Sequence, residues 1–180
     1  MARFVALLRG INVGTAKRLA MADLRALLEA LGHGCVRTLL NSGNAVFDAP
    51  AASAPPKLAA RIQAALAERL RLDSFVIVKS AKSVAAMVAE NRLAEGCENE
   101  SRLIVAITQD SADLARLKAL AHVDFGREKL QLGTEAAYLW CPDGILQSRA
   151  ASTLLSELKD RGTTRNWATM TKIAALLNAA

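Results

Sequence analysis

Phe4-Val5-Ala6-Leu7-Leu8-Arg9-Gly10 decides the fold of the first half of the chain. Five consecutive apolar residues are too few for a typical helix and are characteristic of a strand buried on both faces, which Arg9-Gly10 ends. Leucines at positions 24, 27, 28 and 31 follow at helical spacing, and Gly32 stands where a left-handed C-terminal cap is expected. The stretch therefore predicts a strand that leads into an amphipathic helix.

The remainder of the first half completes a β-α-β-β-α-β order. Residues 36–40 and 45–48 are strand-like, with Asn41-Ser42-Gly43-Asn44 as the turn between them. Pro55-Pro56 opens an amphipathic helix, because proline is tolerated at a helix start, and residues 75–78 close the unit as a strand. This order matches the split β-α-β, ferredoxin-like arrangement.

The second half repeats this order loosely. A helix bearing Val84 and Met87 comes first, and Asp110-Ser111 can cap a helix after a strand at 103–107. The further expected elements are short strands at 123–125, 130–132 and 137–140, a helix capped by Ser152 and ended by Gly162, and a last helix after Asn166. We expect an α+β protein of two tandem ferredoxin-like units, with mostly antiparallel sheets and helices on one face. Their expected limits are residues 1–80, a connecting helix and polar linker at 81–101, and residues 102–180.

Composition indicates a soluble globular protein of the cytoplasm. The chain has 180 residues, of which 52% are hydrophobic and 22% charged. It contains no run of roughly 18 apolar residues such as a membrane-spanning helix needs, and its N-terminus enters a strand without a signal peptide. Cys35, Cys97 and Cys141 lack paired spacing and lie in or beside apolar segments. We expect buried, reduced thiols in a reducing compartment.

The positive charge is concentrated towards the two ends of the chain. The formal net charge is +6. Residues 1–47 carry six Arg/Lys and two Asp/Glu, residues 149–180 carry five and two, and residues 48–148 carry twelve and thirteen. Such a distribution favours a cationic site that attracts anions, although scattered, solvated side chains would produce the same counts.

Three polar clusters interrupt the apolar pattern. They are Arg9-Gly10-Ile11-Asn12-Val13-Gly14, Asn41-Ser42-Gly43-Asn44 and Thr164-Arg165-Asn166-Trp167-Ala168-Thr169. None contains a carboxylate, a histidine or a cysteine. Their hydrogen-bond donors and positive charges suit an anionic or carbonyl-rich ligand, but they supply no nucleophile or general base.

Each cluster has a functional and a structural interpretation. The first can expose backbone N–H groups as an anion-holding nest beside Arg9 and Lys17, or it can be a tight loop that needs glycine. It lacks the P-loop ending and the G-x-G-x-x-G pattern. The second is an ordinary hairpin turn, or its two asparagines read a ligand. In the third, Asn166 is an expected N-cap, and Trp167 either stacks on a base or anchors the packing.

Together these clusters resemble a known bacterial family, the domain of unknown function 1697. The similarity rests on residues 6–14, on residues 42–47, and on Arg165-Asn166-Trp167 followed by Thr169 and Lys172. Where the family often has a Ser-Lys pair, this chain has Ser148-Arg149. The resemblance implies a two-part, ferredoxin-like α+β fold and no particular activity.

The leading hypothesis is a protein that binds a nucleotide or a nucleic-acid phosphate in a basic cleft between the two units. We expect Arg9, Asn12, Asn44, Arg165 and Trp167 to face that cleft. The full set of expected ligand-binding residues is Arg9, Gly10, Asn12, Lys17, Asn41, Ser42, Asn44, Arg165, Asn166, Trp167 and Lys172. No metal or cofactor is expected, and the oligomeric state is left open.

Two other classes of function fit the same sequence. An enzyme acting on a phosphorylated or acyl substrate would need Asp48, Asp124, Asp143 or Ser148 to lie beside the clusters. A protein-interaction scaffold would use the clusters only as caps and turns. Convergence of the clusters in space separates the first two classes from the third.

Overall fold

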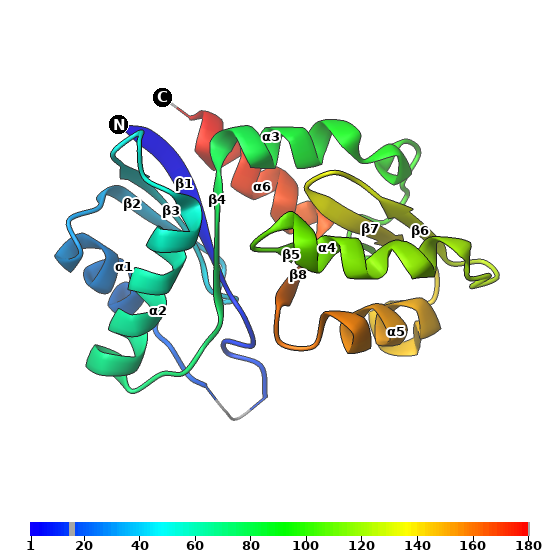
Figure 1. The fold of residues 1–180 in the computed structure, drawn as a ribbon, viewed down its shortest axis with the longest axis horizontal. Coiled ribbons are helices and arrows are strands. Elements are labelled where there is room, and N and C mark those ends of the chain that lie inside the picture. The colour runs from blue at the N-terminus through cyan, green and yellow to red at the C-terminus, as the bar shows by residue number, and fades with distance from the viewer. Residues whose placement is uncertain (15–16, 180) are drawn as a thin grey trace. The chain divides into compact units, whose positions relative to one another are not determined.

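The computed structural model describes residues 1–14 and 17–179. The chain divides into two compact units, Met1–Ala81 with the residues from Ala175 on, and Lys82–Ala174 (Figure 1). Each unit contains a four-stranded antiparallel sheet, and the described residues also form six α-helices. The expected α+β class with antiparallel sheets is confirmed.

Sheet A of unit 1 has the strand order β2-β3-β1-β4. The elements of this unit are β1 (Ala2–Leu8), α1 (Met21–Ala30), β2 (Gly34–Leu39), β3 (Asn44–Ala49), α2 (Pro55–Leu70) and β4 (Val76–Ser80). In the central strand, Leu7 lies opposite Asn44 of β3, and Leu8 lies opposite Val76 of β4. The strands and helices expected in the first half are therefore present and in the expected order.

Local signals begin and end the two helices of unit 1. At the end of α1, Gly32 has a φ of +84°, its N–H donates to Glu29 O at 2.9 Å, and the N–H of His33 donates to Leu28 O at 3.2 Å. These two bonds form a Schellman cap, which requires a left-handed residue that glycine adopts without strain. Pro55 stands at the start of α2, where its missing N–H costs no helical hydrogen bond.

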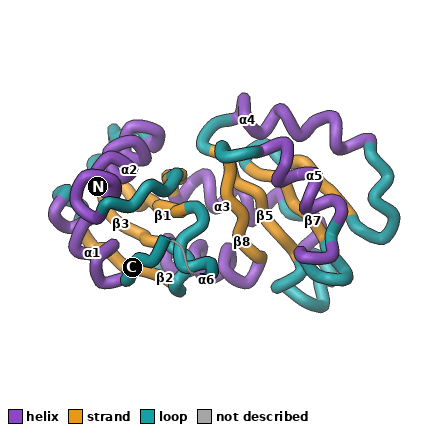
Figure 2. The backbone as a smooth tube through the Cα atoms, turned by 90° about the horizontal axis from the view of Figure 1, so that it is seen from below, coloured by secondary structure: helices purple, strands orange, loops and turns teal. Residues whose placement is uncertain are grey.

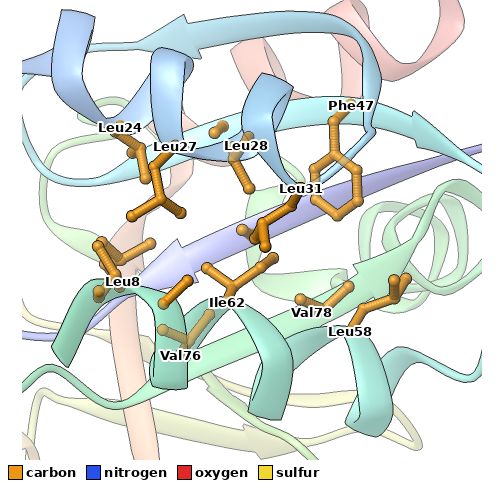
Figure 3. Packing of buried hydrophobic residues seen from close by; sticks show 14 of the residues in the cluster. Leu8, Leu24, Leu27, Leu28, Leu31, Phe47, Leu58, Ile62, Val76 and Val78 are labelled. Atoms are coloured by element: carbon orange, nitrogen blue, oxygen red, sulfur yellow. The ribbon is translucent and has the colours of Figure 1, made fainter. Parts of the chain in front are cut away.

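Both helices cover one face of sheet A. Leucines of α1, Leu58 and Ile62 of α2, and Leu8, Phe47 and Val78 of the strands form one buried cluster (Figure 3). Each fully buried side chain of this kind contributes roughly 1.5–3 kcal/mol. This packing explains why the helical spacing of the leucines predicts the buried face correctly.

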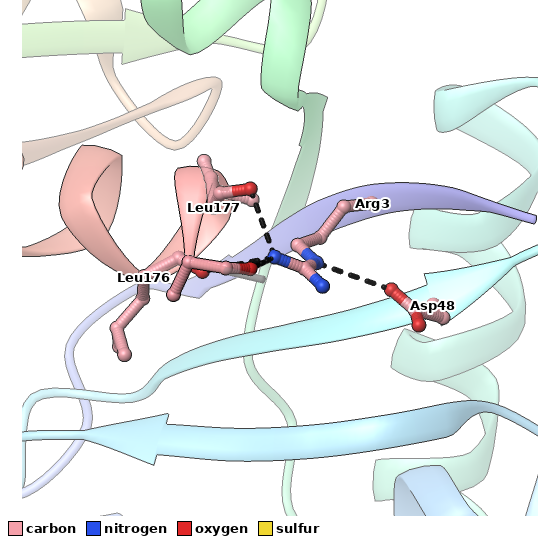
Figure 4. Close-up of polar contacts among 5 residues, drawn as sticks. Arg3, Asp48, Leu176 and Leu177 are labelled. Atoms are coloured by element: carbon pink, nitrogen blue, oxygen red, sulfur yellow. Dashed lines mark hydrogen bonds and ion pairs between the residues drawn. The ribbon is translucent and has the colours of Figure 1, made fainter.

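Arg3 ties β1 to the residues from Ala175 on, in the last turn of α6 (Trp167–Asn178). Its Nη1 donates to Leu177 O at 3.1 Å and to Leu176 O at 3.4 Å, and also to Ala179 O (Figure 4). Its Nε lies 3.4 Å from Asp48 Oδ1. A cation at a helix C-terminus satisfies carbonyls that have no helical partner.

Sheet B of unit 2 has the order β6-β7-β5-β8, so β8 is an edge strand beside β5 (Figure 2). The elements are α3 (Ala81–Glu90), η1 (Arg92–Ala94), β5 (Leu103–Thr108), α4 (Ser111–Ala115), η2 (Arg116–His122), β6 (Lys129–Leu132), β7 (Ala136–Trp140), η3 (Ile145–Gln147), α5 (Arg149–Leu158), β8 (Gly162–Asn166) and α6. Ala137 and Leu139 of β7 face the cores built with α4, η2 and α5. Tyr138 points to the opposite face, where its hydroxyl lies 2.8 Å from Met87 O of α3. Helices thus contribute to both faces of sheet B, so the expectation of helices on one face is wrong for unit 2.

Three expected features of the second half are wrong, and one strand was not expected. Residues 123–125 form no strand; instead Asp124 Oδ1 accepts from the N–H of Gly126 at 2.8 Å, which turns the chain. The cap of α5 is Ser148, whose Oγ accepts from the N–H of Ala151 at 2.8 Å, so Ser152 lies inside the helix. The helix ends at Leu158, and Gly162, which was expected to end it, begins β8. β8 was not expected, because its residues are polar.

The expected linker lies almost entirely in unit 2, and two of the three cysteines are not buried. Residues 81–101 include α3 and η1, and from Lys82 on they belong to unit 2. Cys35, Cys97 and Cys141 are free, but only Cys141 is buried. Cys35 is exposed because it lies at an irregularity of β2, where the register shifts.

Candidate functional site

The first two polar clusters meet at one end of sheet A. The N–H of Leu8, the last residue of β1, donates to Gly43 O at 2.8 Å. On the other side of the strand, the N–H of Arg9 donates to Phe75 O at 2.9 Å, and Ser74 Oγ donates to Arg9 O at 2.9 Å. The loop after β1 and the β2–β3 turn therefore lie side by side. We call this region, residues 9–14, 17–19 and 40–44, the loop end of sheet A.

Asn12 fastens the loop to the turn. Its Nδ2 donates to Leu19 O at 2.9 Å and to Asn41 O at 2.7 Å, and its Oδ1 accepts from the N–H of Leu19 at 3.0 Å. The backbone N–H of Asn12 also donates to Lys17 O at 3.1 Å. The side-chain amide of Asn12 is therefore engaged within the protein, where it holds the loop in place.

Close packing at Gly43 joins the same two segments. Its φ is +76°, and a Cβ built on it would lie 2.8 Å from Leu8 Cβ and 3.4 Å from Ile11 Cβ. The neighbouring Asn44 is fully buried, and its Nδ2 donates to Leu39 O and to Ser42 Oγ, both at 2.9 Å. Glycine is required here by the left-handed backbone and by the close approach of Leu8.

The surface of the loop end is cationic. Lys17 and Arg18 are exposed and Arg9 is half-buried. The sequence has no Asp or Glu at positions 9–19 or 34–47. The neighbouring segment before β4 adds Arg71 and Asp73, both exposed, so its charges cancel. The loop also exposes Val13, with 71% of its surface accessible.

The third cluster belongs to unit 2 and is mostly a strand. Arg165 of β8 lies opposite Val105 of β5, and Asn166 lies opposite Ile104. Asn166 Oδ1 then accepts from the N–H of Thr169 at 2.9 Å, so the expected N-cap is confirmed. The strand β8 runs directly into α6, and its last residue, Asn166, caps that helix. This explains why the segment is polar although it is not a loop.

Arg165 and Trp167 are buried. Arg165 Nη1 donates to Thr163 Oγ1 at 2.9 Å and to Thr164 O at 2.8 Å, and burial lowers the pKa of its guanidinium to about 10. Trp167 is only 7% exposed, and Lys172, further along α6, is exposed. Among the described residues of unit 2 that are expected to bind a ligand, Lys172 is therefore the one whose side chain is exposed.

Asp48, Asp143 and Ser148, three of the groups named for an enzyme, have other contacts in the structure. Asp48 pairs with Arg3 and lies opposite it in the register, towards the end of sheet A away from Leu7 and Asn44. Asp143 pairs with Arg127 at 2.6 Å, and Ser148 caps α5. Within the described residues, no group of three or more His, Cys, Asp or Glu side chains is arranged to hold a metal ion.

Sequence reasoning missed a polar network in unit 2. The carboxylate of Glu90, the last residue of α3, accepts from Thr134 N and Oγ1 at 2.8 Å and from Glu135 N at 3.1 Å. The Tyr138 hydroxyl lies 2.8 Å from Glu90 Oε1. Burial alone would raise the pKa of Glu90, but these hydrogen bonds outweigh it and the pKa is lowered. Burial, and then the bond to Glu90, raise the pKa of Tyr138.

Gly133 is the sequence signal that was available for this network. A Cβ at this position would overlap the Glu90 carboxylate and lie 3.0 Å from Ala136 O. A glycine between two strands marks a turn but does not reveal which distant side chain approaches it. The partner, Glu90, is on a different element.

Comparison with solved structures supports the fold. The chain is similar to the conserved bacterial protein SP0830 from Streptococcus pneumoniae, with a TM-score of 0.80 and 24% identity over 98% of this chain and 99% of that one. Protein BT0572 from Bacteroides thetaiotaomicron matches with a TM-score of only 0.23 and 11% identity, over 95% and 96% of the two chains. The first likeness shows a shared fold.

The chain belongs to the family described as "Protein of unknown function (DUF1697)", which matches residues 1–138. The first two polar clusters lie inside this match, and the Arg165 cluster lies beyond it. No curated protein matches the chain. No helix in the described part combines the length and apolar character needed to cross a bilayer.

Proposed function

We propose that this protein binds a phosphate-bearing ligand, a nucleotide or a nucleic acid, at the loop end of sheet A. One observation carries the proposal: two segments distant in sequence are fastened together by Asn12, while cationic side chains remain on their surface. A loop that is already ordered binds with a smaller entropy loss. Arg9 adds a planar group whose donors match the oxygens of a phosphate.

The internal hydrogen bonds support binding rather than catalysis. The asparagines order the loop and the turn, and Asp48, the candidate acid–base group named in unit 1, pairs with Arg3 towards the other end of sheet A. An enzyme acting on a phosphorylated or acyl substrate would need a proton acceptor near the ligand. The binding proposal needs only charge and donors.

Arg9→Ala tests the proposal, with anisotropy of a labelled single-stranded oligonucleotide and displacement by ATP as the two measurements. We expect the variant to lose detectable binding, and Arg9→Lys to recover only part of it. Lys57→Ala is the control, because Lys57 is an exposed cation in the first turn of α2, beyond the opposite end of β3. Equal affinity of wild type and Arg9→Ala would refute the proposal.

Salt dependence distinguishes the two ligand sources. A nucleic acid that contacts several phosphates loses affinity steeply with salt, with a logarithmic slope of roughly −0.7 per contact for single strands. A nucleotide held at one phosphate gives a shallow slope. We expect Lys17→Ala to reduce the slope for the oligonucleotide by about one contact and to change ATP binding less.

The contribution of unit 2 to this site is also a proposal. The sequence favours Arg165 and Trp167 as further ligand contacts, and the exposed Lys172 extends the same segment. If Lys172 contacts the same ligand, Lys172→Ala should lower the affinity in the same measurement. An affinity equal to that of wild type would assign Lys172 no part in the site.

We further propose that each unit is a ferredoxin-like, split β-α-β domain. The equal strand orders of sheets A and B and the single-face packing of α1 and α2 support this interpretation. An experimental structure in which β2 or β6 pairs with a different neighbour would contradict it.

A further inference from the structure

A cavity of about 250 Å³ lies in unit 2, on the face of sheet B that carries Tyr138. Trp140 forms one wall, because it lies two residues beyond Tyr138 on the same strand face. Lys129 lies opposite Trp140 on β6. The other walls come from η1 and the loop after it, including Arg92, Glu95, Cys97 and Glu98.

The walls are held in place by hydrogen bonds. Gln131 Oε1 accepts from the N–H of Arg92 at 2.9 Å, and Gln131 Nε2 donates to Glu90 O at 2.6 Å, so one side chain of β6 fixes η1. The N–H of Cys97 donates to Ala94 O at 3.2 Å, which turns the loop over the cavity. The cavity is therefore a built feature of this unit and is independent of the loop end of sheet A.

The size of the cavity selects a small ligand. Pockets for drug-sized molecules and cofactors occupy about 300–1,000 Å³. At about 250 Å³ this cavity has room for a molecule of amino-acid size.

The charges of the cavity select a ligand that carries both signs. Four charged residues line the cavity and are exposed: Arg92 and Lys129 are cations, and Glu95 and Glu98 are carboxylates. The formal charges cancel, so neither a simple anion nor a simple cation is favoured. The indole ring of Trp140 adds an apolar face that packs against an aromatic or aliphatic group.

We propose that this cavity binds a small zwitterion, a free amino acid with an apolar side chain. Arg92 and Lys129 contact its carboxylate, Glu95 and Glu98 contact its ammonium group, and Trp140 packs against its side chain. The Cys97 thiol lies in the same wall and is covered when the ligand is bound. This site goes beyond the phosphate-binding proposal and does not depend on it.

The test compares ligands that differ in one charge. L-phenylalanine and L-leucine carry both charges, N-acetyl-L-phenylalanine lacks the ammonium, and L-phenylalaninamide lacks the carboxylate. Tryptophan fluorescence of the full chain should change saturably with the first two, and at least tenfold higher concentrations of the others should be needed. The fluorescence change should disappear in Trp140→Phe, whereas Lys118→Ala, an exposed cation of η2, should retain it.

Thiol alkylation gives a second measurement that does not depend on the indole. We expect L-phenylalanine to slow the reaction of Cys97 with iodoacetamide, read by mass spectrometry of the peptide, and to leave Cys35 unaffected. Cys35 is an exposed cysteine of unit 1 and serves as the internal control. The proposal is overturned if neither zwitterion binds saturably at millimolar concentration, if all four compounds bind equally, or if Cys97 is not protected.

Discussion

The β2–β3 turn of unit 1 and the β6–β7 turn of unit 2 occupy the same place in their sheets, but different groups hold them. In unit 1 the side-chain amide of Asn12 binds the turn at Asn41 O, and the surrounding side chains are cationic. In unit 2 the turn N–H groups of Thr134 and Glu135 bind the carboxylate of Glu90. One turn therefore already holds an anion from its own chain. The other is fastened by a neutral group, and exposed cationic side chains surround it.

The largest loss of stability is expected at Gly43, where the cost of close packing can be separated from the cost of backbone strain. Gly43→Ala should destabilise the protein by about 2–4 kcal/mol, because it adds a left-handed penalty of about 1–2 kcal/mol to the overlap with Leu8. Gly14→Ala, with a φ of +62° and nothing within 4 Å of the added Cβ, should show only the backbone part. Denaturant unfolding measures both. Equal losses would mean that the Leu8 contact contributes nothing.

Removing the charge that holds the β6–β7 turn should have the next largest effect. Glu90→Gln should cost about 2 kcal/mol at neutral pH, since four donors lose a charged acceptor. The pKa of Glu90 is lowered in the folded state, so its contribution is present above the unfolded value of about 4.5 and is lost as pH falls through the folded pKa.

The matching measurement is the unfolding midpoint of wild type and Glu90→Gln between neutral and acidic pH. The two curves should converge on acidification. Glu157→Gln, at an exposed position of α5, should follow wild type throughout. A constant gap between wild type and Glu90→Gln would show that the hydrogen bonds do not depend on the charge.

The opposite pH dependence of stability is expected when a carboxylate replaces the side-chain amide of Asn12, which holds the β2–β3 turn. In Asn12→Asp an oxygen replaces the nitrogen that faces Leu19 O and Asn41 O, so ionisation is opposed and the folded-state pKa is raised. The variant should be close to wild type in acid and lose about 1–2 kcal/mol as pH rises to neutral. Asn41→Asp, an exposed position that contributes its backbone carbonyl, should show little change.

The smallest stability effect is expected for the residue with the largest effect on binding. Arg9→Ala should change the free energy of unfolding by no more than about 0.5 kcal/mol, as for a typical surface substitution. Thermal unfolding without ligand measures this directly. A variant that unfolds outright would make Arg9 a structural residue and would remove the main cation from the proposed site.

Local patterns predict much of this fold. The apolar run at residues 4–8 and the helical spacing of leucines predict β1 and α1 correctly, and Gly32 ends the helix as expected. Asp110 and Asn166 cap their helices as predicted from sequence. Each of these signals acts within a few residues, where the chemistry of one side chain or the period of one element is sufficient.

The errors occur where neighbours far along the chain decide. Residues 123–125 alternate like a strand but find no partner strand, whereas Thr163 and Thr164 form one because β5 is available beside them. Strand formation depends on pairing and on the face that is covered, so polar, β-branched residues at an edge are easily missed. Glu90 was missed for the same reason, since its partners lie on another element.

The sequence alone therefore determined the order of the elements in unit 1, the caps at Asp110 and Asn166, and the residue types at the surface, because these follow from local periodicity and local hydrogen bonds. Only the tertiary structure decided that residues 9–14 meet the Asn41–Asn44 turn, that Asn12 and Gly43 join them, and that Trp140 lines a cavity. The reason is strand register: pairing of Leu7 with Asn44 and of Lys129 with Trp140 sets which side chains meet, and register depends on contacts that no local window contains.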